Sequence, residues 1–358
     1  MLNRQALLLL AIVAGIFFVS NAKVNSINPR TETRPGYAPK EYNINLDLPP
    51  LERWREIVTD YTPAIQAFKS YVLRSAHLPA FFFNFVSYSY AARRDPEYAE
   101  ELQAIAQLSG MEFSMMYLVN FVYELTAYCT STIIRTASGK IIHGRNLDFA
   151  FMPYAANLTA QVSFYRGGNL LYKADVTVGS LGILAGVKPG KFAISLNERH
   201  KGSLLTNLRE YFFQKSMPSL YLVRKAFETA NSFDEAISII STTRIIAPAY
   251  YIVSGVQPHE GVIISRNATG VTNAHWLKDN DPDWYIAVSN YDRDEIDPDL
   301  DYRRIPAENR IYAIGQQNMT EQLLLDEVLA KFPNLNFMSI LSAIMVPSTG
   351  YFNTTMWF

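Results

Sequence analysis

The feature that most constrains the fold is a pair of β-rich segments around a short turn. Thr132 to Thr136 and Ile141 to His143 are rich in β-branched residues and flank a turn at Ser138-Gly139. This pattern predicts a β-hairpin. Its second strand continues through Gly144 to Asp148, so the chain must contain a sheet in which residues just before Thr132 lie beside residues 144–148.

The only cysteine of the 358 residues, Cys129, lies at the start of this hairpin. A lone thiol in a chain with a secretory leader has no disulfide partner and is either reactive or buried as a small hydrophobe. The hairpin brings it near Arg145 and Asp148. A guanidinium and a carboxylate supply both signs of charge to set the protonation of a thiol, which favours a nucleophile.

The remaining segments predict an α+β fold. Residues 51–110 and 114–126 have helical patterns, whereas most of the chain after Cys129 alternates between strands and helices. Trp284 to Ser289 is the last strand that the pattern predicts, and an amphipathic helix is expected over 320–331. The expected strands are 43–48, 160–166, 170–178, 191–196, 250–256 and 261–265, and the expected later helices are 204–215, 219–231 and 233–241.

The N-terminus is typical of a secretory signal. Arg4 precedes an apolar run over residues 6–19 and a small-residue site ending at Ala22, and the run is shorter than the roughly 20 residues that span a bilayer. We therefore expect residues 1–22 to be removed; an uncleaved anchor is the alternative. Four glycosylation sequons agree with this route: Asn157, Asn267, Asn318 and Asn353.

Composition and spacing exclude several classes of function. A net charge of −1 gives no reason to expect a nucleic-acid partner. The five histidines and the single cysteine show no metal-ligand spacing, and no phosphate-binding or dinucleotide motif is present. We expect no metal and no cofactor.

Several separated motifs together resemble the acid ceramidase and N-acylethanolamine acid amidase family of N-terminal-nucleophile hydrolases. They are Tyr42 to Asp47 with Arg53-Trp54, Cys129-Thr130-Ser131 with His143 to Phe149, Leu196 to Arg199, Pro248 to Tyr251, and Ser289 to Arg293 with Tyr302 to Arg304. The resemblance covers nearly the whole chain after residue 22. It implies an αββα sandwich of two antiparallel sheets between helical layers, with a mostly helical part before Cys129.

The resemblance also implies a zymogen that cuts itself between Tyr128 and Cys129. It would yield a helical α-subunit, 23–128, and a catalytic β-subunit, 129–358, joined as a heterodimer. The freed α-amine of Cys129, with an ordinary pKa of about 8, can then act as base for its own thiol. His143 is expected to position the hairpin rather than to take a proton.

Roles for further residues follow from the same resemblance. Arg145 would hold Cys129 and favour its thiolate, and Asp148 would orient the α-amine. Asn290 would donate a hydrogen bond to the oxyanion, and Glu198 would lie near it. Arg303 matches the second active-site arginine of the family, although the adjacent Arg304 competes for that role.

The implied substrate is a lipid N-acyl amide. Ceramide, cleaved to sphingosine and a fatty acid in the lysosome, is the first expectation, and N-acylethanolamines are the alternative. A non-catalytic lipid-binding glycoprotein is a further alternative. The aromatic segment Leu78 to Val86 either lines an acyl channel, touches a membrane surface or is a buried helix face; a lipid-presenting activator protein is a possible partner. The absence of further cysteines departs from the acid ceramidases, so the amine half of the substrate stays open.

Overall fold

The computed structural model describes residues 35–76, 96–122, 127–149, 152–202, 206–207, 209–210, 214, 216–278, 284–295 and 302–357. The strands of this part form one sheet in the order β1-β4-β5-β6-β7-β8-β9-β10 and a second in the order β11-β2-β3-β12-β13. The strands are β1 (Glu41–Asn45), β2 (Ala127–Arg135), β3 (Ile141–Phe149), β4 (Thr159–Arg166), β5 (Asn169–Thr177), β6 (Ile183–Lys188), β7 (Phe192–Glu198), β8 (Ala249–Gly255), β9 (Gly261–Arg266), β10 (Val271–Trp276), β11 (Tyr285–Val288), β12 (Ser339–Val346) and β13 (Tyr351–Met356).

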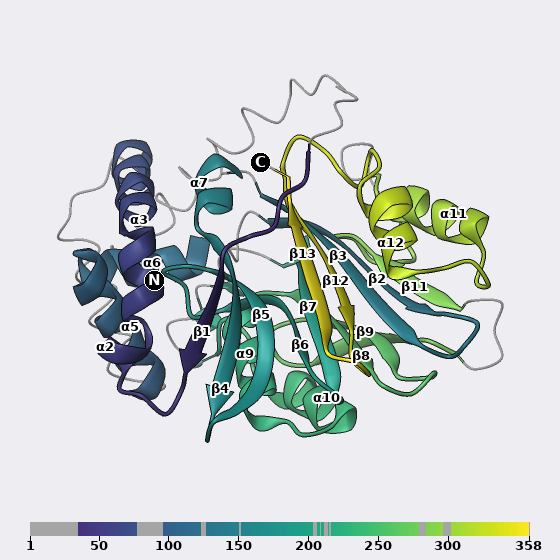
Figure 1. Cartoon of the computed structure of the whole chain (residues 1–358), viewed down its shortest axis with the longest axis horizontal. Coiled ribbons are helices and arrows are strands. Elements are labelled where there is room, and N and C mark those ends of the chain that lie inside the picture. Colours follow the sequence, from purple (N-terminus) through teal and green to yellow (C-terminus); the bar gives the residue numbers. More distant parts are fainter. Residues whose placement is uncertain are drawn as a thin grey trace.

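The two sheets face each other, and helices cover their outer faces (Figure 1). Helices α9 (Ser219–Thr229) and α10 (Phe233–Thr242) pack on the larger sheet, whereas α11 (Arg304–Ile314), the short α12 (Glu321–Leu323) and the π-helical η3 (Leu324–Leu329) lie on the side of the smaller one. A continuous apolar core that includes Cys129 fills the space between the sheets. The predicted αββα class is confirmed.

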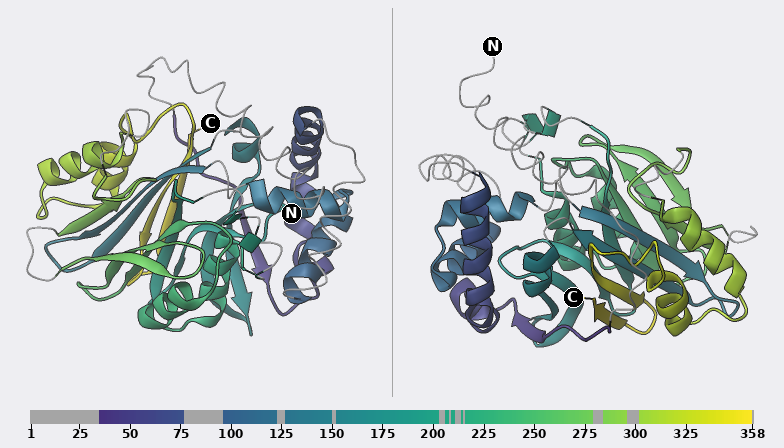
Figure 2. Two further views of the ribbon diagram at one scale, coloured as in Figure 1. Left: turned by 180° about the vertical axis from the view of Figure 1, so that it is seen from behind. Right: turned by 90° about the horizontal axis from the view of Figure 1, so that it is seen from above.

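The part before Cys129 is mostly helical, as predicted, and lies against one edge of the larger sheet (Figure 2). It contains α2 (Pro50–Arg53), α3 (Arg55–Ala76), α5 (Pro96–Ser109) and α6 (Phe113–Val122), while α7 (Met152–Asn157) follows β3. A fully buried ion pair attaches it: Arg224 on α9 donates to both carboxylate oxygens of Glu101 on α5, at 2.7 and 3.0 Å. Trp54 Nε1 donates to the same carboxylate at 2.7 Å.

The predicted hairpin is present and longer than expected. Strands β2 and β3 pair from Ala127 opposite Phe149 to Arg135 opposite Ile141. The turn contains Gly139 at φ +82°, a conformation that glycine adopts without a Cβ penalty. The hairpin forms the centre of the smaller sheet, because β11 pairs with β2 and β12 pairs with β3.

Two expectations about the sheets were wrong. The larger sheet is not purely antiparallel, because β1 pairs with β4 in parallel register. A parallel pair needs a long crossover, and here residues 46–158 provide it, with helices and the β2–β3 hairpin of the smaller sheet. Nor is β11 the last strand. Strands β12 and β13 follow it, and every residue of β12 is buried, so its sequence lacks the alternation by which a half-buried strand is recognised. Strands β6 and β10 and helix α11 were also missed.

Some expectations fall outside the described residues. These are the signal peptide over 1–22, the aromatic segment 78–86 and most of the helix expected over 204–215. In the ranges that are described, no helix combines the length and apolar character needed to cross a bilayer.

A buried carboxyl group between the sheets makes the stability of the fold depend on pH. Asp175 on β5 is fully buried and accepts hydrogen bonds from Thr354 Oγ1 at 2.9 and 3.0 Å, and Gln161 Nε2 donates to the same hydroxyl at 3.1 Å. Burial raises the pKa of Asp175 to about 7, although Thr354 and Arg145 oppose the rise. The folded chain therefore holds this proton more tightly than the unfolded chain, whose carboxyl has the ordinary pKa of 3.8.

We expect Asp175 to stabilise the fold at acidic pH and to lose this contribution as the pH rises to 7. Between pH 4.5 and 7.5 its share of the free energy of unfolding falls by about 3 kcal/mol. Asp175→Asn should remove that pH dependence, measured by urea unfolding at the two pH values. Asp326→Asn, at an exposed carboxylate, should keep the wild-type dependence. Equal pH dependence in wild type and Asp175→Asn would show that Asp175 is not the group responsible.

Candidate active site

The register of the hairpin sets which side chains surround Cys129. Cys129 lies opposite Leu147, and Ser131 lies opposite Arg145. Because side chains alternate along a strand, these four point to one side of the sheet, toward the core between the sheets. Asp148, opposite Tyr128, points to the other side.

Arg145 contacts the thiol directly. Its Nη2 donates to Cys129 Sγ at 3.3 Å, and its Nη1 donates to the carbonyl oxygen of Leu184 on β6. Both side chains are fully buried. Burial raises the pKa of the Cys129 thiol; Arg145 acts in the opposite direction but does not reverse the shift. In this uncut chain burial thus outweighs the effect of Arg145, and its role in favouring the thiolate stays a prediction.

Asn290 holds the backbone nitrogen of Cys129, the atom that cleavage would turn into an α-amine. The Cys129 N–H donates to Asn290 Oδ1 at 2.8 Å, and Arg303 Nη2 donates to the same oxygen at 2.8 Å. Asn290 Nδ2 donates to the backbone carbonyl of Glu198 at 2.7 Å. In the uncut chain the predicted oxyanion donor is thus bonded to Glu198, and its role toward an oxyanion stays a prediction.

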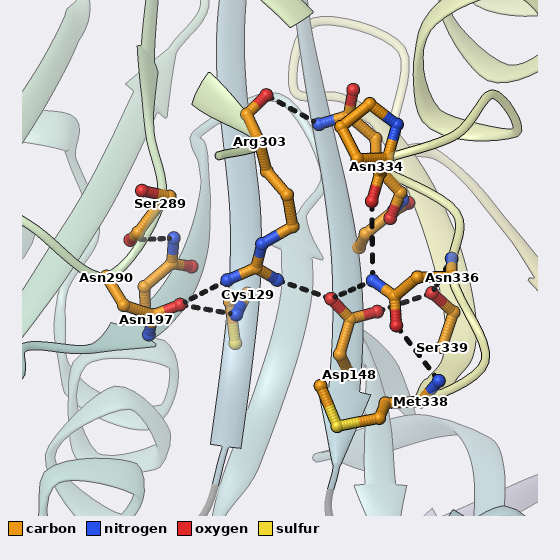
Figure 3. A network of polar contacts seen from close by, with 12 residues as sticks. Cys129, Asp148, Asn197, Ser289, Asn290, Arg303, Asn334, Asn336, Met338 and Ser339 are labelled. Atoms are coloured by element: carbon orange, nitrogen blue, oxygen red, sulfur yellow. Dashed lines mark hydrogen bonds and ion pairs between the residues drawn. The ribbon is translucent and has the colours of Figure 1, made fainter. Parts of the chain in front are cut away.

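Asp148 reaches this nitrogen through Arg303 and Asn290 (Figure 3). Arg303 Nη1 forms an ion pair with the Asp148 carboxylate. Ser339 Oγ donates to Asp148 at 2.5 Å and Asn336 Nδ2 donates at 3.1 Å. Burial raises the pKa of Asp148, and the charge of Arg303 and the two neutral donors oppose that rise. In the uncut chain Asp148 has only this indirect connection to the nitrogen, and its role in orienting the amine stays a prediction.

The structure distinguishes between the two adjacent arginines. Arg303 lies between Asn290 and Asp148, and its carbonyl accepts a hydrogen bond from Asn334 Nδ2 at 3.0 Å. Arg304 instead contacts Glu308 at 3.5 Å, one turn further along α11. Only Arg303 joins the network around Cys129.

Sequence reasoning missed the segment that completes the carboxylate site. Asn334 and Asn336 lie shortly before β12 and Ser339 is its first residue, and all three bond to Asp148 or Arg303. The signal was available as three polar residues spaced among apolar ones at the start of a buried apolar segment. It was overlooked because that segment was not recognised as a strand.

The side chain of Tyr128, before the predicted scissile bond, lies in an aromatic setting. Its ring centroid is 5.1 Å from that of His200 and 5.8 Å from Arg303 Cζ. His200 in turn lies 5.3 Å from the ring of Tyr291. Strand β2 runs through Tyr128 and Cys129 without interruption, so this is the geometry of the uncut chain.

A small apolar cavity of about 40 Å³ adjoins the thiol side of the hairpin. Leu147, opposite Cys129, and Leu184, whose carbonyl binds Arg145, both line it. The other lining residues come from α3, from α7 and the segment after it, from both sheets and from α9: Phe68, Phe149, Ala155, Leu158, Thr159, Thr177, Ser180, Gly182, Leu220 and Ile340. The cavity thus lies between Leu147, the residue opposite Cys129, and Phe68 of the part before Cys129.

The remaining predicted sites lie at the surface or stay open. Asn157, Asn267 and Asn318 are exposed, whereas Asn353 is half-buried on β13. Their glycosylation stays a prediction. Among the residues that the structure describes, no three His, Cys, Asp or Glu side chains converge as they would around a metal ion.

Two stacked sheets between helical layers, with a thiol on a central strand whose backbone nitrogen is held by an amide side chain, define an N-terminal-nucleophile hydrolase. Comparison with known proteins agrees with this class. The model of the linear amide C–N hydrolases, the choloylglycine hydrolase family, matches residues 129–317. The chain belongs to this family and is a hydrolase of linear amide carbon–nitrogen bonds.

Relatives with similar sequences carry two names. The N-acylethanolamine-hydrolyzing acid amidase of Caenorhabditis elegans is 32% identical over 89% of this chain and 93% of its own. The acid ceramidase of Homo sapiens is 30% identical over 98% of this chain and 95% of its own. The solved structure of the Caenorhabditis elegans amidase ortholog matches with a TM-score of 0.57 and 32% identity, covering 61% of this chain and 93% of that one.

A second family model covers the part before Cys129. It is described as the beta subunit of N-acylethanolamine-hydrolyzing acid amidase and matches residues 37–87. This description gives the letter β to the N-terminal piece, whereas we used it above for residues 129–358. The difference concerns the names and does not bear on the expected boundary at Cys129. We refer below to the N-terminal and C-terminal pieces.

Proposed function

We propose that this protein cuts itself between Tyr128 and Cys129 and then hydrolyses lipid N-acyl amides, with ceramide as its substrate. The observation that carries the proposal is the environment of one residue. Arg145 contacts the thiol of Cys129 while Asn290 holds its backbone nitrogen. The match to the hydrolase family also begins at Cys129, which supports the choice of this residue as the first of the mature catalytic piece.

The proposed self-cleavage has two steps, an acyl transfer and a hydrolysis. Cys129 Sγ attacks the carbonyl carbon of Tyr128, the carbon–nitrogen bond breaks, and the nitrogen takes up the thiol proton. Water then hydrolyses the thioester, which leaves a carboxylate on Tyr128 and an α-amine on Cys129. That amine, with a reference pKa of about 8, accepts the thiol proton in later turnovers.

Turnover of the lipid repeats these steps with an external amide. The thiol gives its proton to the α-amine and attacks the acyl carbon, and the amine half of the substrate leaves with that proton. Arg145, next to Sγ, favours the attacking thiolate. The resulting thioester is hydrolysed by water to the fatty acid, and Cys129 is regenerated.

The two pieces, 23–128 and 129–358, are proposed to stay together as a heterodimer. The buried Glu101–Arg224 ion pair joins them, and Tyr61 Oη donates to the carbonyl of Thr159 at 2.9 Å. Strand β1 of the first piece is also hydrogen-bonded to β4 of the second. None of these contacts involves the bond between Tyr128 and Cys129.

The cavity beside the thiol supports an acyl-chain site. Its lining is mostly apolar and it reaches from Leu147 to Phe68 on α3. A volume of about 40 Å³ has room for only about three water molecules, so a long acyl chain requires this cavity to widen. We propose that removal of the Tyr128–Cys129 bond allows that widening, since residues 127 and 128 lie opposite Phe149 and Asp148.

N-acylethanolamines are the second candidate substrate, because relatives named for their hydrolysis are 31 or 32% identical to this chain. An acidic compartment, the lysosome, is the proposed location. The word acid in the relatives' names and the raised pKa of Asp175, which stabilises the fold at low pH, support it. Contact with a membrane surface or with an activator protein stays a prediction.

Ala155→Phe tests the acyl site, because Ala155 lines the cavity and is half-buried. The larger side chain should lower kcat/KM for a hexadecanoyl amide by about tenfold, from a loss of about 1–3 kcal/mol typical of overpacking, and leave an acetyl amide unchanged. Ala313→Phe, at an exposed position of α11, is the control.

The substrate itself is tested by comparing the hydrolysis of ceramide and of an N-acylethanolamine that carry the same acyl chain, at acidic pH. Faster turnover of the ethanolamide would favour the second candidate, and turnover of neither would overturn the proposed function.

A further inference from the structure

A chain of buried polar side chains runs between the two sheets beneath Cys129. Its five side chains come from four strands, β8, β3, β7 and β2, and all five are fully buried. His143 lies between two serines: Nδ1 is 3.0 Å from Ser254 Oγ and Nε2 is 2.8 Å from Ser195 Oγ. Ser195 Oγ is 3.0 Å from Ser131 Oγ, which is 2.7 Å from Asn197 Oδ1. Asn197 Nδ2 is 3.2 and 3.0 Å from the carbonyl oxygens of Val288 and Ser289.

The end of this chain fixes the direction of the hydrogen bonds from Asn197 back to His143 Nε2. Asn197 Nδ2 contacts two carbonyl oxygens, which only accept, so its Oδ1 must face a donor, which is Ser131. A hydroxyl has one hydrogen, so Ser131 must accept from Ser195, and Ser195 must accept from His143 Nε2. In a neutral ring the remaining nitrogen, Nδ1, accepts from Ser254.

The ring of His143 therefore carries a hydrogen on Nε2, and a neutral ring has no hydrogen on Nδ1. Burial and the neighbouring charge of Arg145 lower the pKa of His143 to about 3, in agreement with a neutral ring at the acidic pH proposed for catalysis. His143 consequently acts as a donor of fixed orientation and does not take the thiol proton.

The hydrogen-bond chain ends at Ser289, the residue before the one that holds the reacting nitrogen. Asn197 binds the Ser289 carbonyl, and the next residue, Asn290, binds the backbone nitrogen of Cys129 (Figure 3). At its other side the chain includes Ser131, two residues after Cys129 on the same strand face. It therefore connects both partners of the Cys129–Asn290 contact through β7.

We propose that His143 is a positioning residue, which orders this hydrogen-bond chain and thereby fixes Asn290 against the nitrogen of Cys129. The inference rests on the proposed role of Cys129 in acyl transfer. A displacement of about 1 Å at a reacting centre lowers rates by about a hundredfold. Loss of one hydrogen bond from this network should therefore reduce kcat and the rate of self-cleavage by about that factor and leave KM unchanged.

Four variants test the proposal. Ser195→Ala breaks the chain, whereas Ser342→Ala removes an equally buried, hydrogen-bonded hydroxyl on β12 that lies outside it. His143→Gln keeps a donor where Nε2 lies, and His143→Leu removes it. We expect about a hundredfold lower kcat and slower cleavage for Ser195→Ala and His143→Leu, but values within about tenfold of wild type for Ser342→Ala and His143→Gln. Equal losses for Ser195→Ala and Ser342→Ala would overturn the positioning role.

Nuclear magnetic resonance separates this proposal from the proposed function. With labelled histidine and asparagine, His143 should show the neutral Nε2–H form at every pH from 4.5 to 8. The side-chain amide signal of Asn290 should shift in Ser195→Ala and stay in place in Ser342→Ala. These signals are measured in the uncut Cys129→Ala chain, so they report on the chain of hydrogen bonds even if wild type proves inactive. An Nδ1–H form, a titration in that range or an unmoved Asn290 signal would overturn the inference.

Discussion

Cys129→Ala is expected to leave the chain in one piece and to lower amide hydrolysis by about a thousandfold or more, as loss of the nucleophile does in other acyl-transfer enzymes. The substitution removes the only sulfur atom that Arg145 contacts in the described part of the chain. The Cys129 backbone nitrogen and its bond to Asn290 remain, so the fold should be retained. Mass analysis after incubation at acidic pH and a fluorogenic acyl amide assay measure the two effects.

Cys129→Ser is the matched comparison. A hydroxyl can attack the same carbonyl but is much less easily ionised than a thiol, so we expect slow cleavage and weak hydrolysis rather than none. If Cys129→Ala hydrolysed the amide at the wild-type rate, the nucleophile would have to be another residue.

Arg303→Met is expected to have the largest effect on stability. Asp148 is fully buried and Arg303 is its only cationic partner among the described residues. Removal of one member of a buried ion pair leaves the other charge uncompensated and costs about 3–5 kcal/mol. The same change removes a donor from Asn290 Oδ1, so self-cleavage should fail as well.

A second substitution separates the two consequences. In Asp148→Asn/Arg303→Met neither charge remains, so most of the lost free energy of unfolding should return while cleavage stays absent. Arg166→Met is the control, because Arg166 forms an ion pair with Glu228 at 3.1 Å while 41% of its side chain is exposed; we expect it to lose about 1 kcal/mol or less. Normal cleavage by Arg303→Met, or an equal loss for both arginines, would contradict this account.

The sequence predicted the centre of the site because that centre is local. A hairpin around Gly139 places residues near Cys129 opposite residues near Leu147, because the length of the turn sets the register. The same alternation explains a point that the motif did not show. Arg145 and Asp148 are three residues apart on one strand, so they point to opposite sides of the sheet, and only Arg145 reaches the thiol.

What the sequence did not predict depends on distant segments. Strand β12 is buried along its whole length and gave no alternating pattern, so the neighbouring Asn336 and Ser339 were not connected with Asp148. The choice of Arg303 over Arg304 follows from where α11 begins. The parallel pairing of β1 with β4 depends on packing of the intervening helices, which no local pattern encodes.

The most direct test is the N-terminal sequence and mass of the purified protein before and after incubation at acidic pH, with Cys129→Ala treated in parallel. We predict a fragment that begins at Cys129 in the wild type alone, and two pieces that elute together on gel filtration because the Glu101–Arg224 contact joins them. A wild-type chain that stays whole at every pH while it hydrolyses lipid amides would contradict the proposed role of the Cys129 α-amine.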